Sequence, residues 1–492
     1  MTALDFLADA RRWQGAALLE GLRQAPNRIQ FSPVSERAGL ATRLAKASPV
    51  HALLAVLPDH PGCAAYFKAA YAQNPGLALT WASYAVGCPP WSLHPWVESH
   101  RAQLRQALIA EPTRPLSFAF QAAYRAAYSG SLALPLRQAF YRWLAARMPA
   151  PAAVPVRSTG DSPRPVVGLL GESFHDNHVL KRTCQPEIDA LRQAGFAVWL
   201  LQTGAQCRPV SGIDGVIPLL WNGQALRRGA GPALDALILL EPFGTIVDAV
   251  GAGQRWAPVQ LACAVTPTPV GSPQLDYWLQ GQDAPFAAEA PVLAVPGVGV
   301  TRWHEAPRPV LPWSAREGLV VASAPHKWSA PFLGWLADLV KDGVPLKLLP
   351  GGAVSAPALQ QALAQVLPRR GWTLQASCSH TEYLDILSRA RCALDAFPYG
   401  GLTTIADAAS TGTPMLLPPG DNGTQRVAQA LGQHYGHGVL GGQPRRCSEG
   451  TRLRQRRRTY EHAPSPDLAP CATRAGAGNL WPLSTFPEAV IR

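Results

Sequence analysis

The chain has 492 residues, of which 47% are hydrophobic and 15% are charged. This length accommodates two to four domains of ordinary size, and the composition excludes a generally disordered chain because it provides material for large cores. The net charge of +12 would suggest nucleic-acid binding, but nine arginines and only four acidic residues lie within 441–492. The basic excess is therefore concentrated in the last tenth of the chain, and no nucleic-acid partner is expected.

The cysteines and the first residues indicate a cellular compartment. The nine cysteines are odd in number and scattered, without a C-x-x-C pair or metal-ligand spacing, as is typical of unpaired thiols in a reducing cytoplasm. Residues 1–13 lack the basic start and apolar run of a signal peptide. No stretch reaches the ~18 uninterrupted apolar residues of a membrane span. We expect a cytoplasmic protein without a membrane span and without a bound metal.

Residues 1–147 are predicted to form an all-helical domain. Alanine, leucine, arginine and glutamine dominate there, and apolar residues recur at helical spacing, for example in 102–109 and 134–148. No repeat of fixed length is evident. Residues 148–165 are rich in proline and are predicted to be a linker.

Residues 166–312 are predicted to form a first Rossmann-like domain. Apolar strands are expected at 166–170, 196–201 and 234–240, and their alternation with helical segments indicates a parallel sheet with covered faces. The loop after the first strand carries His175 and His178. A neutral histidine there could accept a proton from an acceptor group or orient a donor phosphate; the alternative is simple surface polarity.

Residues 313–440 are predicted to form a second Rossmann-like domain, with strands at 318–323, 346–350 and 372–374. The first of these strands ends at Ser323, and Lys327 follows shortly afterwards. A lysine at this place could neutralise the charge that develops on a departing nucleoside diphosphate. The alternative is a solvated surface lysine.

The stretch 379–419 predicts a helix, a buried strand, a glycine turn, a second helix and a second strand. Ser379 and Glu382 have the spacing of a capping box, and a strand is expected over 392–397. Gly400 and Gly401 are expected to supply turn dihedrals that aim free N–H groups at an anion.

The second helix of this stretch carries further candidate binding residues. Thr403 or Thr404 is expected to cap its start and to add hydroxyl donors, so that the site suits a diphosphate. Asp407 could accept hydrogen bonds from a ribose; alternatively, its spacing from Thr404 is that of a capping box, and it would only satisfy the helix start.

The pattern F-P-Y-G-G-L-T-T-I-A-D at 397–407, followed by T-G-T-P-M at 411–415, resembles the nucleotide-sugar site of glycosyltransferase family 41. This family includes the O-GlcNAc transferases and the bacterial glucosyltransferases that modify asparagines of adhesins. The F-P-Y-G start is most similar to the adhesin enzymes. The R-x-A-P-x-Q pattern at 255–260 and the D-Y pair at 276–277 resemble the family as well, and similarity extends over roughly 165–440.

The resemblance implies a fold, a chemistry and roles for single residues. It implies an α/β fold of GT-B architecture, with two Rossmann-like domains after an all-α domain. Lys327 matches the family lysine, and His178 matches its histidine better than His175 does. Tyr383 falls beside the expected uracil, where stacking and core packing are both open, and His380 is a weaker candidate for the base edge.

The implied reaction is an inverting, metal-independent transfer of a hexose or N-acetylhexosamine from a UDP-sugar to a protein side chain. No cofactor is expected besides the UDP-sugar donor. The acceptor would be Asn or Ser/Thr, with a secreted adhesin before its export as a candidate partner. Leu402 replaces the histidine of O-GlcNAc transferases, and Thr403 replaces the asparagine of the adhesin enzymes. Two alternatives therefore stay open: a degenerate nucleotide-sugar-binding protein, and a GT-B transferase that acts on glycan or lipid.

The last segment, 441–492, differs from all that precedes it. It is rich in arginine and proline and contains no lysine. A shifted reading frame in a GC-rich gene produces such a composition; the alternative is a genuine disordered basic tail. The composition predicts low order from about Gly441, and an uncovered apolar surface with weak or absent transfer in this form of the chain.

Overall fold

The computed structural model describes residues 14–29, 32–86, 96–110, 116–125, 127, 133–148, 164–176, 178–203, 210–222, 226–263, 267–297, 309–351, 356–375, 378–418, 420, 422–435 and 438–439. Most of the predicted linker and the whole 441–492 segment lie outside these residues. The chain divides into two compact units, one of 1–132, 305–420 and 432–461, the other of 133–304, 421–431 and 462–492. Each is described by itself.

The amino-terminal part is helical, as its composition predicts. Its helices are α2 (Gly15–Ile29), α3 (Val34–Ala45), α4 (Pro49–Ala52), η2 (Leu53–Ala55), α5 (Cys63–Gln73), α6 (Pro75–Ala85), α7 (Trp96–Ala110) and α8 (Leu116–Arg125). Their apolar faces meet in one core that includes Leu22, Leu53 and Trp81. Among the described residues, no helix combines the length and apolar character that a membrane crossing requires.

The next helix, α9 (Ala133–Ala145), belongs to the unit of the first sheet, although the sequence analysis included it in the helical domain. Arg137 lies 4.1 Å from the centroid of the Phe243 ring and donates a hydrogen bond to Thr268 Oγ1 at 2.8 Å. A Cβ on Gly253 would lie 2.9 Å from Leu144, so only glycine allows this close approach. Through these contacts α9 packs in the same unit as the first sheet.

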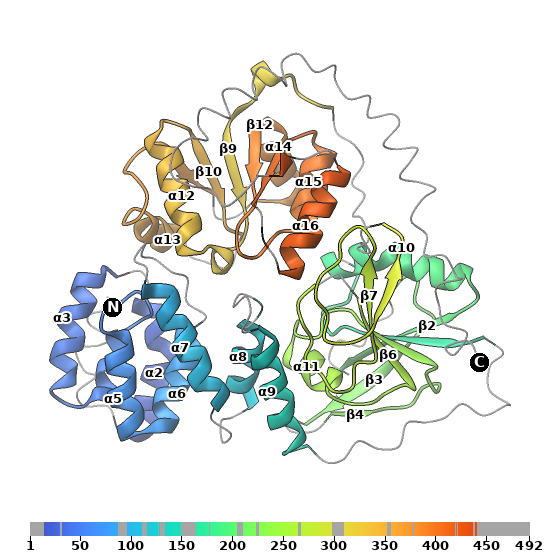
Figure 1. The fold of residues 1–492 in the computed structure, drawn as a ribbon, viewed down its shortest axis with the longest axis horizontal. Helices are drawn as coiled ribbons and strands as arrows, with labels where there is room; N and C mark the ends of the chain where they lie inside the picture. Colours follow the sequence, from blue (N-terminus) through green and yellow to red (C-terminus); the bar gives the residue numbers. More distant parts are fainter. Residues whose placement is uncertain are drawn as a thin grey trace. The chain divides into compact units, whose positions relative to one another are not determined.

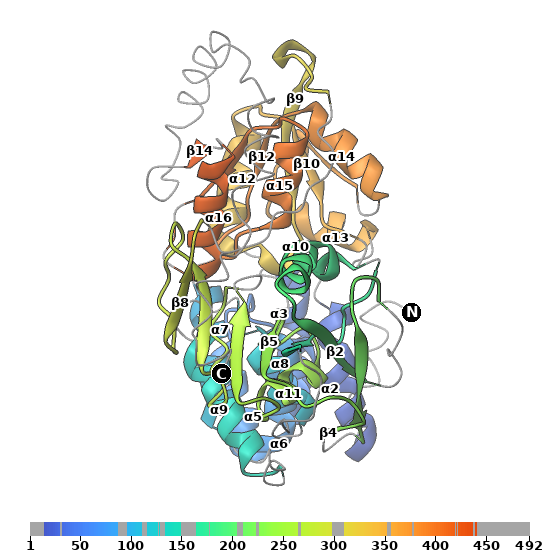
Figure 2. The same ribbon diagram turned by 90° about the vertical axis from the view of Figure 1, so that its right-hand side faces the viewer.

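The first sheet has eight strands in the order β4-β3-β2-β1-β5-β6-β7-β8, and Figure 2 shows β4 and β8 at its opposite edges. Every pair is parallel except β3 with β4. The strands are β1 (Val166–Leu170), β2 (Ala197–Thr203), β3 (Gly215–Trp221), β4 (Leu226–Arg228), β5 (Ala236–Leu239), β6 (Val259–Cys263), β7 (Tyr277–Gly281) and β8 (Val292–Val295).

Helices cover both faces of this sheet. Helix α10 (Val179–Gln193) packs through Leu180 and Ile188 on the face that carries Val167 and Leu169. On the opposite face lies α11 (Ile246–Ala252), where a Cβ on Gly251 would come within 2.9 Å of Leu170. The three strands predicted in this region are confirmed within one to two residues.

The second sheet has six strands in the order β11-β10-β9-β12-β13-β14, all parallel. The strands are β9 (Glu317–Ala322), β10 (Leu346–Leu349), β11 (Trp372–Leu374), β12 (Ala390–Leu394), β13 (Met415–Leu417) and β14 (Gly438–Val439). The associated helices are α12 (Ala330–Lys341), α13 (Ala356–Leu363), α14 (His380–Arg389) and α15 (Thr403–Ser410). Most of the next helix, α16 (Gly423–His434), belongs to the unit of the first sheet.

Alternating side chains determine which helices cover which face of this sheet. Leu319, Val321 and Leu348 share a core with residues of α12 and α13. Helices α14 and α15 pack against each other and lie on the other side of the sheet (Figure 1).

The carboxyl ends of β9 and β12 are neighbours, because Val321 of β9 pairs with Leu394 of β12.

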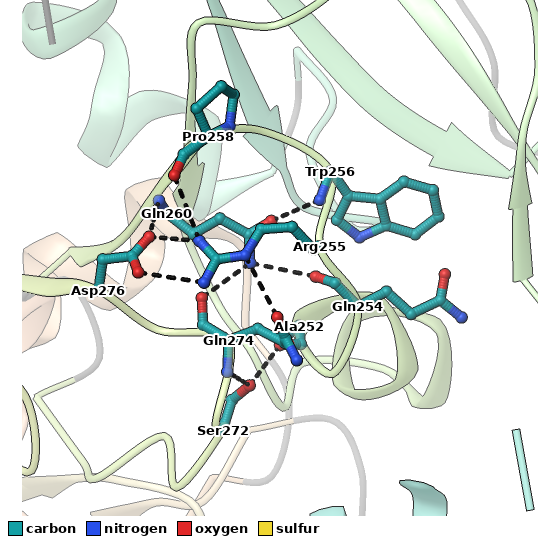
Figure 3. Close-up of polar contacts among 9 residues, drawn as sticks. All are labelled: Ala252, Gln254, Arg255, Trp256, Pro258, Gln260, Ser272, Gln274 and Asp276. Carbon is teal, nitrogen blue, oxygen red and sulfur yellow. Dashed lines mark hydrogen bonds and ion pairs between the residues drawn. The ribbon is translucent and has the colours of Figure 1, made fainter. Parts of the chain in front are cut away.

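The R-x-A-P-x-Q and D-Y patterns form a clamp at the amino-terminal ends of β6 and β7 (Figure 3). The Arg255 guanidinium forms a two-point ion pair with the Asp276 carboxylate, and Asp276 also accepts the Gln260 N–H at 2.8 Å. The fully buried Gln260 amide accepts the Trp256 N–H at 2.8 Å and donates to the carbonyls of Gln254 and Gln274, both at 3.1 Å. These residues thus bind one another.

We predict that Gln260→Leu lowers the free energy of unfolding by about 3 kcal/mol, because one buried N–H and two carbonyls lose their partners. Chemical denaturation measures the change. Gln254→Leu is the matched control, since only the backbone carbonyl of Gln254 takes part in the clamp. Equal stability of both variants would contradict the structural role of Gln260.

Candidate functional site

The turn between β12 and α15 differs from the prediction in two respects. The strand ends at Leu394 instead of 397, because Asp395 already turns its side chain toward Gly401. Gly400 and Gly401 do not have the positive φ angles expected of them. A Cβ on Gly401 would lie 3.3 Å from Asp395 Oδ1, so this glycine is needed for a close approach. Its N–H is donated to Asp395 at 2.9 Å and is not free for a ligand.

The free backbone N–H donors lie at the start of α15 and not in the glycine turn that precedes it. The predicted cap at Thr403 or Thr404 is wrong: Leu402 is the N-cap residue, and it has no side chain that can accept the hydrogen bonds of a helix start. Among the described residues, none accepts a hydrogen bond from the backbone N–H of Thr403. An uncapped helix start leaves donors and a positive helix end that suit an anion.

Lys327 lies beside this turn, in a short 3₁₀ segment, η6 (Pro325–Lys327), that follows β9. Its Nζ is 4.8 Å from the centroid of the Tyr399 ring. The next residue, Trp328, is buried, forms an isolated bridge with Pro398 and donates its indole N–H to Ser323 Oγ at 2.8 Å. Ser323 is therefore engaged within the protein, and the loops after β9 and β12 are joined.

A buried carboxylate, Asp395, and a half-buried lysine, Lys327, influence each other at this edge. Burial lowers the pKa of Lys327, and the charge of Asp395 opposes this effect. Burial raises the pKa of Asp395 to about 7, although the N–H of Gly401 and the charge of Lys327 favour its carboxylate. A buried lysine near a carboxylate can stay charged where a lone buried lysine would lose its proton.

Asp407 does not cap the helix; this alternative is wrong. It lies inside α15, is buried, and is hydrogen-bonded to the hydroxyl of Tyr383 from α14. Thr404 is a second partner of that hydroxyl, and burial raises the pKa of Tyr383 well above its ordinary value, so the hydroxyl remains a donor. The exposed His380 ring lies 5.7 Å from the Tyr383 ring, centroid to centroid.

The two histidines of the first sheet lie in the loop after β1, with ring centroids 5.3 Å apart. The loop is anchored by Gln202 of β2, whose amide donates to the carbonyls of Gly171 and Phe174 at 3.2 and 2.6 Å. His175 is exposed. His178 is the N-cap of α10, and its Nδ1 accepts the N–H of Leu180 at 3.2 Å.

The hydrogen bond that Nδ1 accepts from Leu180 determines the tautomer of His178. In the neutral ring the proton must then be on Nε2, because Nδ1 acts as the acceptor. Nε2 is thus a hydrogen-bond donor. This tautomer suits a role in orienting an acidic or phosphate oxygen better than a role as a proton acceptor.

The structure brings most of the predicted residues of the second sheet to one edge. Tyr383 is hydrogen-bonded to Asp407 and Thr404. In the neighbouring turn Gly401 donates to Asp395, and Lys327 packs on Tyr399. His175 and His178 belong to the other unit. Asp395 and Tyr399 were missed. A single carboxylate inside the apolar run 392–397 was the available signal for Asp395, because an unpaired charge is rare in a buried segment.

The second sheet also has a cavity of about 970 Å³ at a different place. The amino-terminal ends of β9, β10, β11 and β12 line it together with α14. The candidate site lies instead at the carboxyl ends of β9 and β12, where ligands bind in open parallel sheets. Within the described ranges, no group of three or more His, Cys, Asp or Glu side chains is arranged to hold a metal ion.

Comparisons with known proteins identify solved structures of similar fold. No protein-family model and no curated protein matches the sequence. The structure is similar to an O-GlcNAc transferase mutant of Thermobaculum terrenum, with a TM-score of 0.56 and 17% identity over 94% of this chain and 95% of that chain. A kitacinnamycin glycotransferase gives a TM-score of 0.34 and 15% identity over 67% of this chain and 98% of that chain, too little to support an argument. The first similarity confirms the predicted α/β fold of GT-B architecture.

We predict that Tyr383→Phe lowers the free energy of unfolding by about 1–2 kcal/mol, because the buried Asp407 carboxylate loses a hydroxyl donor. A double-mutant cycle with Asp407→Ala measures the coupling by chemical denaturation. In the Asp407→Ala background the tyrosine substitution should have little further effect. Additive effects of the two substitutions would show that this hydrogen bond does not contribute to stability.

Proposed function

We propose that this chain is a glycosyltransferase of family 41 that moves a hexose or N-acetylhexosamine from a UDP-sugar to an Asn or Ser/Thr side chain of a protein, with inversion and without a metal. The GT-B fold and the motifs at 397–407 and 411–415 support this proposal together. The fold alone hosts many chemistries, so the residues of the site must carry the rest.

The observation that carries the proposal is the pairing of a partly desolvated lysine with an open helix start at one sheet edge. The ends of β9 and β12 lie side by side, so Lys327 and the N–H groups at Thr403 come from adjacent loops. Both are positive and both are held by surrounding contacts. Preorganised positive groups of this kind stabilise the charge that develops on a departing diphosphate.

The remaining residues have complementary roles in this proposal. Asp407 lies one helical turn beyond Thr403 in α15 and would bind the ribose, and Tyr383 of α14, its hydrogen-bond partner, would bind the uracil, with His380 nearer the base edge. His178 would donate from Nε2 to orient the donor phosphate, and His175 would be the candidate for accepting the acceptor proton. The acceptor oxygen or nitrogen attacks the anomeric carbon opposite the leaving UDP, which inverts the configuration.

We further propose that the protein acts in the cytoplasm on an acceptor such as an adhesin before export, with no cofactor besides the UDP-sugar. Among the described residues, the cysteines at 63, 184, 263, 378 and 392 form no disulfide, which is compatible with a reducing compartment. The test is co-expression with candidate adhesins followed by intact-mass spectrometry, which identifies sugar and acceptor together. UDP binding by calorimetry without any UDP release or mass shift would favour the non-catalytic alternative.

We predict that Lys327→Ala leaves the fold intact and lowers turnover about a hundredfold or more, since one strong electrostatic stabiliser is typically worth on the order of 3 kcal/mol. UDP release in the presence of acceptor measures the rate. Lys341→Ala is the matched control, because Lys341 is an exposed lysine at the end of α12. Wild-type turnover in Lys327→Ala would remove this lysine from the mechanism.

A further inference from the structure

The Asp395 carboxylate has no part in the proposed chemistry, yet it lies at the centre of the site. It follows the last residue of β12 and is only 4% exposed. Its Oδ1 accepts the N–H of Gly401 at 2.9 Å, and the N–H of Ala396 also donates to the carboxylate. A carboxylate this deeply buried is rare unless it has a partner charge.

The cation whose charge favours this carboxylate is Lys327. Its Nζ lies 4.8 Å from the centroid of the Tyr399 ring. Tyr399 and Gly401 belong to the same turn, so the carboxylate binds the turn on which the lysine packs. The isolated β-bridge between Trp328 and Pro398 joins the two loops through their backbones.

The space around Gly401 also shows that Asp395 lies in close contact with the turn. A Cβ there would be 3.3 Å from Asp395 Oδ1 and 3.2 Å from Thr404 Oγ1. Since the φ angle of Gly401 is not positive, backbone dihedrals do not explain why a glycine is needed. A side chain at this position would require Asp395 and Thr404 to move by a few tenths of an ångström.

We propose that Asp395 is a positioning residue of this site: its carboxylate fixes the Pro398–Gly401 turn through the Gly401 N–H, and its negative charge, beside the turn whose Tyr399 ring lies under the ammonium, holds Lys327 in place. This inference rests on the proposed function, in which Lys327 and α15 receive the diphosphate. Asp395 does not touch the reacting atoms. It acts through the lysine and through the turn that precedes α15.

The first test measures the titration of the Lys327 side chain and does not depend on turnover. The sequence contains only six lysines, so side-chain ¹³C labelling gives a short list of signals, and Lys327→Ala assigns the one of interest. In Asp395→Asn the Lys327 signal should titrate at lower pH than in the wild type, because a negative charge that favours the ammonium is gone. Asparagine can still accept the Gly401 N–H, so the melting temperature should change little.

Asp338→Asn is the matched control, since it removes an exposed carboxylate that pairs with Lys341 at 3.2 Å. It should leave the Lys327 titration unchanged. An unchanged Lys327 titration in Asp395→Asn overturns the proposal. If Asp395→Asn does not fold, Gly401→Ala takes its place: the added methyl, 3.3 Å from Asp395 Oδ1, pushes on the carboxylate, and an unchanged Lys327 titration again counts against the proposal.

The second test is kinetic. Asp395→Asn should lower kcat about tenfold in the wild type and have no further effect in the Lys327→Ala background, because residues that act as a unit are not additive. Equal losses in both backgrounds would indicate a merely structural role and overturn the proposal. If Lys327→Ala turns over like the wild type while Asp395→Asn still changes the lysine titration, the proposed catalytic role of Lys327 fails and its link to Asp395 stands.

Discussion

The candidate site depends on one physical constraint, the placement of a buried carboxylate and a half-buried lysine on one turn at the ends of adjacent parallel strands. Removing either charge from water alone is costly, and their mutual attraction offsets part of that cost only while the geometry holds. The register of β9 with β12 provides this geometry, since it sets Val321 opposite Leu394 and so places the following loops next to each other. The loops then hold Lys327, Tyr399 and Asp395 as a group.

Strand positions could be predicted where apolar runs are short and bounded by turn residues. Residues 166–170 and 372–374 coincide with β1 and β11 for this reason. The edge strands β4 and β8 were not predicted: β4 has a single apolar residue, and β8 is an apolar run of only four residues with exposed positions. The strand at 392–397 was predicted too far along the chain: Ala396 and Phe397 are apolar, but the ladder already ends at Leu394.

The sequence also located most of the residues at the second sheet edge, largely through a family resemblance. It could not reveal which of their polar groups are already engaged. The Gly401 N–H belongs to Asp395, the Ser323 hydroxyl to Trp328, and the Gln260 amide to a clamp at the amino-terminal ends of its strands. Such bonds join residues whose proximity arises only from the folded sheet, and a spacing rule that covers one turn of chain cannot detect them.

The position of α9 has a consequence for how the chain can be divided. Arg137, Phe140 and Tyr141 meet Phe243, which follows β5, and a Cβ on Gly271 would lie 2.9 Å from the Gln138 backbone N. This helix therefore completes the apolar layer of the first sheet. A module boundary drawn at the proline-rich segment would strip that layer and expose aromatic surface. A boundary before 133 keeps this layer with the sheet that it covers.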